Sequence, residues 1–530
     1  MLNVVRAIDR NAQRSPDADA VVCGTRRLSH ASLGRRVHAL AAGLQELGIR
    51  RGDVVALLLP NSTEFLEATL GINRIGGIFL PLNTRLAPEE WRYILDHAGA
   101  VAVVTQRSLA HELDGLLPHK LPSILHVIIV EDVDSRIGAV SDANAAGARD
   151  TESRSVGYER LLSRHAGAVV PVADVGESDV QRLMYTSGTT ALPKGVPLTY
   201  GNVLWKTHGH IVEFGLTAAD RTLIAGPMYH VGAFDLPGTG VLYVGGSLVI
   251  LPKFDPHSVM VAIQAERPTN LWLAPSMVNA ILSLDDLGSF DTTTVRFITN
   301  GGEKMPAPLV EGLLRAFPKA WLADSYGLTE TASGDTFLDR DHVMSKLGSV
   351  GRPVIHLDLR VVDEHNKEVA AGSPGEIVLR GPKVFHGYWK DPEATATAIL
   401  DGWFHTGDIG YLDSDGYLFI EDRKKEMIVS GGENVATPEV ERVLYEHPDV
   451  LEAAVFGVPD ERWGEVPLAA VVLRPDARAA EKELIEHCAS RLAKFKIPKG
   501  VRFVDQLPRS PSGKVLKREL RSEFGKDLTA

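Results

Sequence analysis

A run of small polar residues between positions 186 and 195 has the composition of a phosphate-binding loop. Such a loop offers backbone N–H groups, hydroxyl donors and one ammonium group, a combination that suits a polyphosphate. The ammonium comes from Lys194, and the segment Val180 to Tyr185 predicts a strand that leads into the loop. The hydroxyl side chains surround a single glycine, in the order Thr186, Ser187, Gly188, Thr189 and Thr190.

The loop differs from two familiar nucleotide-binding patterns. Lys194 is followed by Gly195 rather than by Ser or Thr, and the glycine spacing differs, so this is not a Walker A sequence. A Rossmann fingerprint is also absent from this segment. A polar turn between a strand and a helix would explain any three of these residues, whereas the complete string favours a phosphate-binding loop.

The segments that must position this loop alternate between two types. Runs rich in Val, Ile and Leu, such as Val54 to Leu59, Val101 to Thr105 and Val127 to Val130, have the composition of buried strands. Helix-like stretches such as Leu33 to Leu47 lie between them. This alternation predicts α/β layers with mainly buried parallel strands.

The second half of the chain predicts two further regions. After about Gly348, short strands and Gly or Asp turns predict a small β-rich subdomain, with strands at Leu357 to Val362, Gly375 to Leu379 and Asp413 to Ile420. The charged run Glu421 to Glu426 then suits either an exposed turn or an interdomain hinge. The last hundred residues predict an α/β segment with helices at Pro438 to Tyr445 and Glu481 to Leu492.

Bulk properties narrow the class of protein. A chain of 530 residues, 44% hydrophobic and 23% charged, suits a soluble protein with several subdomains. A net charge of -12 argues against a nucleic-acid partner, because phosphate-backbone binding needs clustered Lys and Arg. Two cysteines, and the lack of a secretory signal or an integral membrane segment, predict a reducing cytoplasmic location. A homo-oligomer is compatible with these properties.

Five further segments match, in chain order, motifs of one enzyme superfamily. Together with the loop, they make the chain resemble the adenylate-forming (AMP-binding) superfamily of acyl-CoA synthetases, aryl-CoA ligases, peptide-synthetase adenylation domains and luciferases. The resemblance extends over nearly the whole chain and is strongest to fatty or aryl acyl-CoA synthetases. The five segments are Pro227 to His230, Ser325 to Thr331, Gly402 to Asp408, Asp422 to Lys425 and Pro508 to Lys514.

The resemblance implies a fold and a reaction. The fold is α/β, with a large multi-subdomain N-terminal adenylation domain over 1–424, which includes the β-rich subdomain at about 348–422. A mobile α+β C-terminal domain covers 425–530, with the hinge at Lys425. The enzyme would use ATP and Mg²⁺ to convert a hydrophobic carboxylic acid into an acyl-adenylate, and would then transfer the acyl group to coenzyme A.

The catalytic roles that the resemblance implies fall on three residues. Lys514 would bridge the substrate carboxylate and the α-phosphate, where a compact ammonium suits charge neutralisation. Glu330 would hold Mg²⁺ together with the substrate phosphates. His230 would line the acyl pocket and gate the entry of the thiol. Besides the loop and Lys194, ATP or AMP would contact Gly301, Gly302, Glu303, Tyr326, Gly327, Thr329, Asp408 and Arg423.

Two further groups of residues follow from the resemblance. The residues that would line the acyl pocket are Val231, Gly232, Ala233, Phe234, Asn300 and Leu328. Coenzyme A would be bound by Arg85, Gly431, Gly432, Glu433, Trp463, Phe495 and Lys496.

Several alternative functions stay open at this point. A related ligase could load a carrier protein instead of free CoA, a luciferase-like monooxygenase shares the fold, and a non-catalytic AMP-binding protein would need none of the reaction-linked residues. Ala191 stands where the family often has a glycine, and Glu303-Lys304 replaces smaller residues. These two departures raise a stricter hypothesis, in which the enzyme only thioesterifies an acyl-adenylate that is supplied to it.

Overall fold

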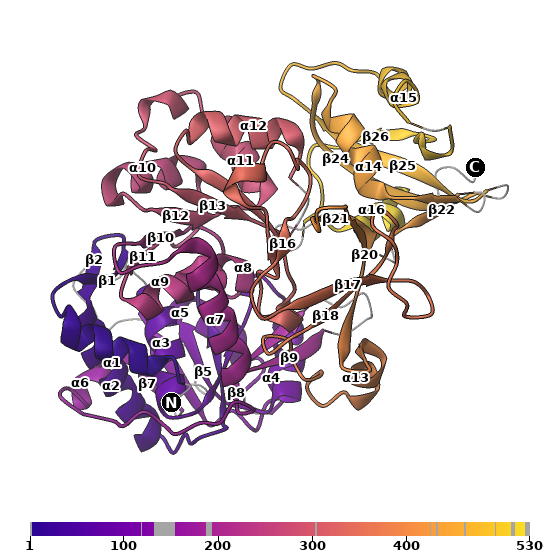
Figure 1. Cartoon of the computed structure of the whole chain (residues 1–530). Helices are drawn as coiled ribbons and strands as arrows, with labels where there is room; N and C mark the ends of the chain where they lie inside the picture. Colours follow the sequence, from indigo (N-terminus) through magenta and orange to yellow (C-terminus); the bar gives the residue numbers. More distant parts are fainter. Residues whose placement is uncertain are drawn as a thin grey trace.

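The chain folds into a large N-terminal part and a smaller C-terminal part, which lies against one end of it in yellow in Figure 1. The structure is a computed structural model, and it describes residues 3–117, 119–131, 154–186, 193–302, 305–423, 426–430, 433–460, 463–492, 494–509 and 515–524. It gives no side-chain description for Asp114, Asp422, Arg423, Val429, Glu433 or Asn434. This mixed α/β architecture confirms the predicted fold class.

The first sheet carries the predicted phosphate-binding loop at its edge. Its strands lie in the order β7-β6-β5-β3-β4-β8-β9 and are parallel except for the last pair. The prediction of buried parallel strands is therefore confirmed. The bounds are β3 (Val54–Leu58), β4 (Ile78–Pro81), β5 (Ala100–Gln106), β6 (His126–Val130), β7 (Ser155–Gly157), β8 (Val180–Thr186) and β9 (Lys194–Thr199).

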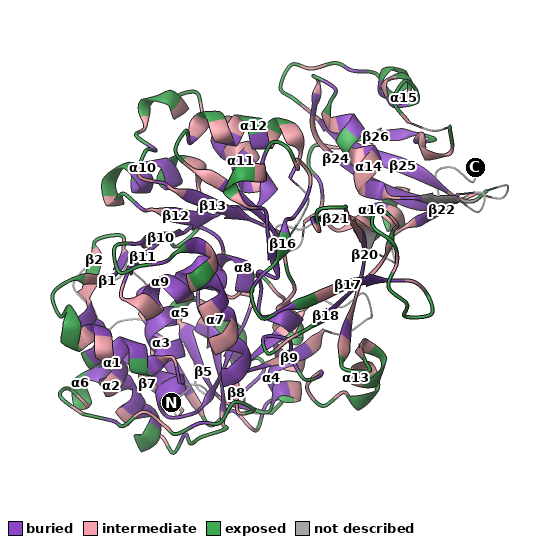
Figure 2. Ribbon diagram, in the orientation of Figure 1, coloured by how far each residue is buried: buried purple, intermediate pink, exposed green. Residues whose placement is uncertain are grey.

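Helices cover both faces of this sheet because successive strand residues point to opposite sides. Val55 and Leu57 of β3 pack with α2 (His30–Glu46) and α3 (Thr63–Arg74), whereas Val54 packs with α4 (Pro88–Ala98). Figure 2 shows these strands as buried purple ribbons beneath helices with exposed outer faces. The remaining helices of this region are α1 (Val5–Arg14), α5 (Arg107–Asp114) and α6 (Tyr158–Arg164).

The second sheet has strands in the order β16-β15-β14-β13-β12-β10-β11-β1-β2 and is parallel from β14 to β1. Its strands are β1 (Asp19–Cys23), β2 (Arg26–Ser29), β10 (Arg221–Ile224), β11 (Ser247–Ile250), β12 (Asn270–Trp272), β13 (Phe297–Asn300), β14 (Trp321–Tyr326), β15 (Thr336–Phe337) and β16 (Arg352–Pro353). Residues of both sheets share one core with α2 and α3. The carboxyl ends of β12, β13 and β14 therefore lie next to one another, where parallel α/β sheets bind ligands.

Shorter elements connect the strands of the second sheet. The helices are α7 (Tyr200–Phe214), α8 (Val231–Phe234), α9 (Gly240–Val244), α10 (Pro256–Glu266), α11 (Pro275–Leu282) and α12 (Ala307–Ala316). Single turns occur at η2 (Asp235–Thr239), η3 (Leu287–Ser289), η4 (Thr329–Thr331) and η5 (Arg340–His342). Thr329 and Glu330 lie in η4, a 3₁₀ turn that closely follows β14.

The predicted β-rich region is a five-stranded antiparallel sheet. The strand predicted at Asp413 to Ile420 starts later than expected, because residues 413–417 form a turn before β21. Asp413 accepts hydrogen bonds from the backbone N–H groups of Asp415 and Tyr417, and Gly416 has a φ of 79°. The elements are β17 (Asp358–Val362), β18 (Gly375–Arg380), α13 (Pro392–Ala398), β19 (Ile399–Leu400), β20 (Trp403–Leu412) and β21 (Leu418–Arg423).

The C-terminal part has its own sheet and two hydrophobic clusters, one on each face. The predicted helix at Glu481 was too long, because it ends at Ala489. The elements are β22 (Ile428–Ser430), β23 (Glu433–Val435), α14 (Thr437–Tyr445), β24 (Val450–Asp460), β25 (Gly464–Leu473), α15 (Glu481–Ala489), η6 (Lys494–Lys496), β26 (Val501–Phe503) and α16 (Lys517–Phe524). Within the described part of the chain, no helix combines the length and the apolar character needed to span a bilayer.

Candidate active site

A large cavity lies where the ends of the second sheet face the β-rich region and the C-terminal part. It encloses about 1410 Å³, including space open to solvent. The cavity brings together five residues that the sequence assigned to nucleotide or acyl binding, namely Gly302, Tyr326, Gly327, Leu328 and Asp408. They come from the ends of β13 and β14 and from β20, so the fold joins positions more than a hundred residues apart.

The C-terminal part forms the opposite wall of this cavity with charged residues that the sequence analysis missed. Lys517 lies 2.8 Å from Glu441 of α14, and Arg509 lies 3.2 Å from Glu452 of β24. Arg509 also forms an antiparallel bridge with Val515, and both line the cavity. The two ends of the segment that carries Lys514 therefore meet at the cavity wall.

Tyr326 and Asp408 form a hydrogen-bonded pair inside the cavity. The Tyr326 hydroxyl donates to Asp408 Oδ2 over 2.7 Å, and the Asp408 side chain is nearly buried. Burial and the neighbouring carboxylate raise the pKa of the Tyr326 phenol, so its hydroxyl keeps its proton. Asp408 of β20 lies directly opposite Arg423 of β21 in the antiparallel register, which places both predicted ribose contacts at one position of the sheet.

Glu330 lies beyond Tyr326, in the turn η4, and is 8% exposed. Its carboxylate accepts a hydrogen bond from the Tyr388 hydroxyl at 3.0 Å. Burial and the charge of Glu330 raise the pKa of Tyr388, so the phenol acts as the donor. The Lys194 ammonium lies 4.9 Å from the centre of the same phenol ring. A residue that the sequence analysis did not single out thus contacts the two charges assigned to the metal and the phosphates.

The predicted phosphate-binding loop joins two antiparallel strands. Thr186, the last residue of β8, pairs with Lys194, the first residue of β9. Gly195 is held closely, since a Cβ atom at this position would lie 2.9 Å from Cβ of Trp389. Both ends of the loop are therefore fixed by the sheet and by the segment around Trp389.

The residues present suit Mg²⁺ only if the substrate supplies further ligands. Glu330 offers one carboxylate, and no group of three or more His, Cys, Asp or Glu side chains forms a metal-ligating cluster in the described part of the chain. Magnesium is commonly held by one or two carboxylates together with substrate phosphates. Glu330 therefore fits a site that forms with bound ATP.

The predicted acyl-binding segment follows β10 and packs against Trp272. The Gly232 N–H donates to His230 Nδ1 over 3.1 Å, and the ring centres of His230 and Trp272 are 6.4 Å apart. Burial lowers the pKa of His230 to about 4, so the imidazole is neutral at physiological pH. A Cβ atom on Gly232 would lie 3.2 Å from the Trp272 indole, so the glycine makes room for this ring.

Trp272 is the large side chain beside the predicted acyl pocket, and the sequence analysis did not identify it. It is 4% exposed at the end of β12, and a Cβ atom on Gly226 would lie 2.9 Å from its ring. No pattern in the sequence singles out this position, because an aromatic residue at the end of an apolar strand is an ordinary core residue. The indole packs closely against His230 and the small residues Gly226 and Gly232.

Asn300 and the glycines beside it lie at the ends of β13 and β14. Asn300 is fully buried, and its amide donates to Asp324 over 2.8 Å. Gly301 and Gly327 are close to other atoms, since added Cβ atoms would lie 3.0 Å from Ser325 Oγ and 2.5 Å from the backbone nitrogen of Gly334. The backbone at these strand ends is thus packed too tightly for larger residues.

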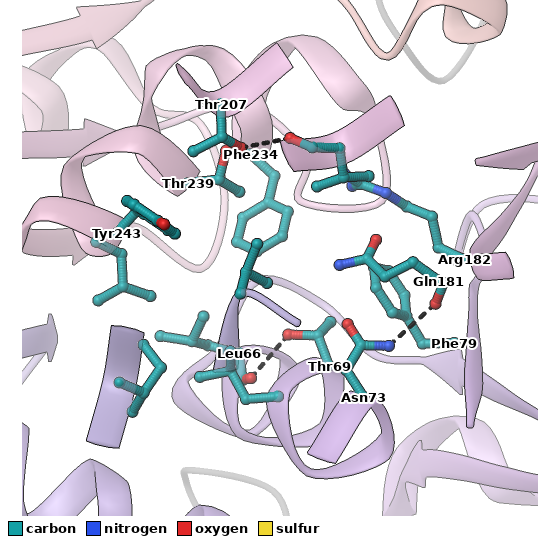
Figure 3. Close-up of a pocket in the computed structure, with 15 residues that line it drawn as sticks. Leu66, Thr69, Asn73, Phe79, Gln181, Arg182, Thr207, Phe234, Thr239 and Tyr243 are labelled. Atoms are coloured by element: carbon teal, nitrogen blue, oxygen red, sulfur yellow. Dashed lines mark hydrogen bonds between the residues drawn. The ribbon is translucent and has the colours of Figure 1, made fainter. Parts of the chain in front are cut away.

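Val231 and Ala233 are buried in the short helix α8, which begins after the half-buried His230, whereas Phe234 faces a second cavity. This cavity lies among α1, α3, β8 and α9, and Figure 3 shows the Phe234 ring projecting into it toward Leu66. Gln181 and Tyr243 also line it. Phe234 therefore contributes to a different cavity from the one that holds Tyr326.

The predicted CoA contacts lie in two separate parts of the chain. Arg85 is exposed in the N-terminal part, and Trp463 is 41% exposed after β24. Phe495 packs against the C-terminal core, and Lys496 lies 2.6 Å from Glu439. No hydrogen bond or ion pair between described residues joins Arg85 to the three C-terminal residues.

Several predicted site residues lie outside the described residues. These are Ser187, Gly188, Thr189, Thr190, Glu303, Lys425, Gly431, Gly432 and Lys514, together with the side chains of Arg423 and Glu433. Their assigned roles stay predictions.

Comparison with known proteins adds independent information. The family model described as AMP-binding enzyme matches residues 8–389, and that described as AMP-binding enzyme C-terminal domain matches residues 439–514. A feruloyl-CoA synthase of Amycolatopsis sp is 39% identical over 97% of this chain and 98% of that protein. The long-chain-fatty-acid–CoA ligase FadD13 of Mycobacterium tuberculosis is 35% identical over 99% of both chains.

A solved structure gives the same result for the fold. The anthranilate CoA ligase AuaEII, in complex with anthranoyl-AMP, superposes with a TM-score of 0.90 at 26% identity. The match covers 100% of this chain and 98% of that one.

Proposed function

Because the chain belongs to the AMP-binding enzyme family and is an acyl- or aryl-CoA ligase that works through an adenylate, we propose that its substrate is a hydrophobic carboxylic acid and its acceptor is free coenzyme A. The observation that carries this proposal is the packing of Trp272 beside His230 and Gly232, which gives the predicted acyl side an aromatic wall and a neutral imidazole. Moving the apolar part of an acid out of water and onto such a wall is favourable in free energy.

In the first step, a carboxylate oxygen of the acid attacks the α-phosphorus of ATP and pyrophosphate leaves. The chain's residues bind and orient the two anions, because positioning and charge stabilisation supply most of the catalysis of such a step. Asp408 and Arg423 hold the ribose, Lys194 and the loop hold the phosphates, and Lys514 neutralises charge between the acid and the α-phosphate. Glu330 would hold Mg²⁺, which supplies charge neutralisation on the phosphates when it is bound.

The role of Lys514 is supported by the residues around it. Arg509 and Val515 bracket its segment and both line the cavity that contains Tyr326. A segment that starts and ends at the cavity wall can bring an ammonium group to the nucleotide. Lys514 would leave this position after adenylation, when the C-terminal domain rotates.

In the second step, the CoA sulfur attacks the acyl carbon, the bond from that carbon to the phosphate oxygen breaks, and AMP leaves. Lys425 would be the hinge between domains at 1–424 and 425–530. Gly431, Gly432 and Glu433 would line the pantetheine tunnel, with Arg85, Trp463, Phe495 and Lys496 at its mouth. His230 would gate the thiol without accepting its proton, since its pKa of about 4 makes it a weak base.

The hinge assignment has a direct test. In Lys425→Pro, the fixed φ of proline should restrict the domain rotation, so acyl transfer to CoA should fall about tenfold or more while adenylation changes little. The two half-reactions are measured separately, with Lys424→Ala as the control. Equal loss of both half-reactions in folded Lys425→Pro would reject the hinge.

One experiment tests the proposed function as a whole. A panel of aryl, aliphatic and polycyclic acids is assayed for acid-dependent ATP–pyrophosphate exchange and, separately, for acyl-CoA formation. We expect both activities with one class of apolar acid. The cellular location proposed for this enzyme is the cytoplasm. Turnover restricted to small polar acids would reject the hydrophobic substrate.

The same panel separates the two alternatives. Ala191 and Glu303 favour the enzyme that only thioesterifies a supplied acyl-adenylate, and this alternative predicts CoA-dependent release of AMP without any pyrophosphate exchange. A carrier-protein ligase would show exchange but no transfer to free CoA. Normal exchange followed by acyl-CoA formation would exclude both.

A further inference from the structure

Tyr388 connects two charged groups that come from distant parts of the chain. Its hydroxyl donates to Glu330 Oε1 at 3.0 Å, and the Lys194 ammonium lies 4.9 Å from the centre of its ring. Lys194 begins β9 at the edge of the first sheet, whereas Glu330 lies in η4 after β14 of the second sheet. One neutral side chain thus contacts the anion and the cation at the same time.

The backbone around Tyr388 is attached to the same two elements. The Phe385 N–H donates to the Glu330 carbonyl over 2.8 Å, and the Trp389 N–H donates to the Gly195 carbonyl over 2.8 Å. The Tyr388 N–H itself donates to Thr395 Oγ1 at the start of α13. The phenol therefore has a fixed position relative to both the predicted metal ligand and the phosphate-binding loop.

A neutral phenol suits this place better than a direct ion pair would. Among the described residues, Lys194 and Glu330 form no ion pair with each other, and a direct pair would have to break when a metal–polyphosphate complex enters. A hydroxyl donor uses one of several lone pairs of the carboxylate, and a ring face attracts the ammonium without neutralising it. The phenol therefore orients both charged groups without forming an ion pair with either of them.

We propose that Tyr388 is a positioning residue for the metal–polyphosphate complex: its hydroxyl orients Glu330 for Mg²⁺ and its ring face places Lys194 for the phosphates. This inference rests on the proposed function, because it assumes that Glu330 holds the metal. Outer residues that hydrogen-bond a metal ligand typically change metal affinity by about 10–100-fold. The aromatic face contributes a smaller effect, about two- to fivefold in affinity for an exposed cation–π contact.

Binding of ATP in the absence of any acid tests the proposal without turnover. Isothermal titration calorimetry gives the Kd of ATP with saturating Mg²⁺ and with EDTA. The Kd in EDTA divided by the Kd with Mg²⁺ is the factor by which the metal increases the affinity for ATP. In Tyr388→Phe this ratio should fall about tenfold, whereas the Kd in EDTA should stay within about twofold because the ring remains. In Tyr388→Leu the Kd in EDTA should rise as well, by about two- to fivefold.

Tyr417 provides a matched control within the same chain. Its hydroxyl donates to Asp339 over 2.6 Å, and Lys346 lies 5.0 Å from its ring centre, yet none of these residues lines the large cavity. Tyr417→Phe should leave the metal-dependent ratio unchanged. Tyr388→His, which keeps an aromatic ring and an N–H donor, should restore part of the ratio and serves as the second variant if Tyr388→Phe does not fold.

A double-mutant cycle with Glu330→Gln distinguishes an action through Glu330 from a general structural effect. If Tyr388 acts through this carboxylate, Tyr388→Phe should lower the ratio in the parent and cause no further loss in Glu330→Gln. A Tyr388→Phe ratio within twofold of the parent would overturn the inference and leave the proposed function intact. A parent enzyme whose ATP affinity does not depend on Mg²⁺ would overturn both the role of Glu330 and this inference.

Discussion

The regions proposed for the phosphates and for the acyl group differ in the interactions of their side chains. In the region proposed for the phosphates, the Tyr388 hydroxyl donates to Glu330, the Tyr388 ring faces the Lys194 ammonium, and the Tyr326 hydroxyl donates to Asp408. On the acyl side, His230 is a neutral ring that packs near an indole over a glycine. Charges and hydrogen bonds hold the side chains of the first region, whereas the sizes of the packed side chains shape the second region.

This difference separates the two tasks of the enzyme. ATP is the same for every member of the family, so charged groups in fixed positions suffice to bind it. The acid differs between the relatives, which are named for ferulate and for long-chain fatty acids. Changes of side-chain volume alter an apolar pocket without disturbing charges elsewhere. Substitutions on the phosphate side should therefore change the rate for all acids, whereas those on the acyl side should change their ranking.

The largest effect is expected for Lys514. Lys514→Ala should reduce adenylation about 10²–10³-fold for every acid, because a charge that stabilises the transition state is lost. Thioester formation from a supplied acyl-adenylate should change much less. Pyrophosphate exchange and CoA-dependent consumption of acyl-AMP measure the two steps. Re-ranking of the acids by this variant would contradict the division between the two sides.

Glu330→Gln should also lower adenylation for all acids, by about 10²-fold at low Mg²⁺, because the amide keeps the size of the side chain but loses its charge. Raising the Mg²⁺ concentration should recover part of the rate. Glu441→Gln, on the opposite wall of the cavity, is the control. If the defect is the same at every Mg²⁺ concentration, Glu330 has no role at the metal.

Trp272→Phe should change the preference between acids about tenfold while the KM for ATP stays within about twofold, because space opens only on the acyl side. The measurement is the ratio of kcat/KM for a bicyclic acid to that for a monocyclic acid. Trp321→Phe, which changes an indole away from both cavities, is the matched control. If the ratio of the kcat/KM values does not change, Trp272 does not line the acyl pocket.

The smallest effect concerns the pH dependence. The pKa of His230 is lowered to about 4 by burial, so the imidazole is neutral above about pH 5 and gains a proton only below that range. His230→Gln should therefore keep the shape of the pH–rate profile between pH 5.5 and 8, even if the overall rate falls. An inflection near pH 6.5 that disappears in the variant would contradict the neutral role.

The same shift has a consequence for stability. The unfolded chain binds a proton at this histidine as the pH falls through 6.5, whereas the folded chain does so only near 4. The free energy of unfolding should therefore decrease as the pH falls from 6.5 to 4. His230→Gln should show less of this decrease in thermal unfolding experiments.

Several elements of the fold could be predicted from local patterns. Apolar runs predicted β3, β5 and β6, since a strand buried on both faces is rich in apolar residues. The Gly and Asp turns predicted the β-rich region. The strand predicted from Asp413 begins only at Leu418, because the Asp413 carboxylate accepts hydrogen bonds from the backbone of the intervening turn, an interaction that competes with strand pairing.

The sequence by itself predicted the residues of the phosphate side. The hydroxyl-rich loop indicated Lys194, and the resemblance of the motifs to the AMP-binding superfamily implied the roles of Glu330 and Asp408, which stay predictions. Only the tertiary structure indicated the roles proposed for Tyr388 and Trp272, because an aromatic residue in a strand or loop is usually a core residue. Their meaning depends on the elements that pack against them, and such long-range packing leaves no local pattern in the chain.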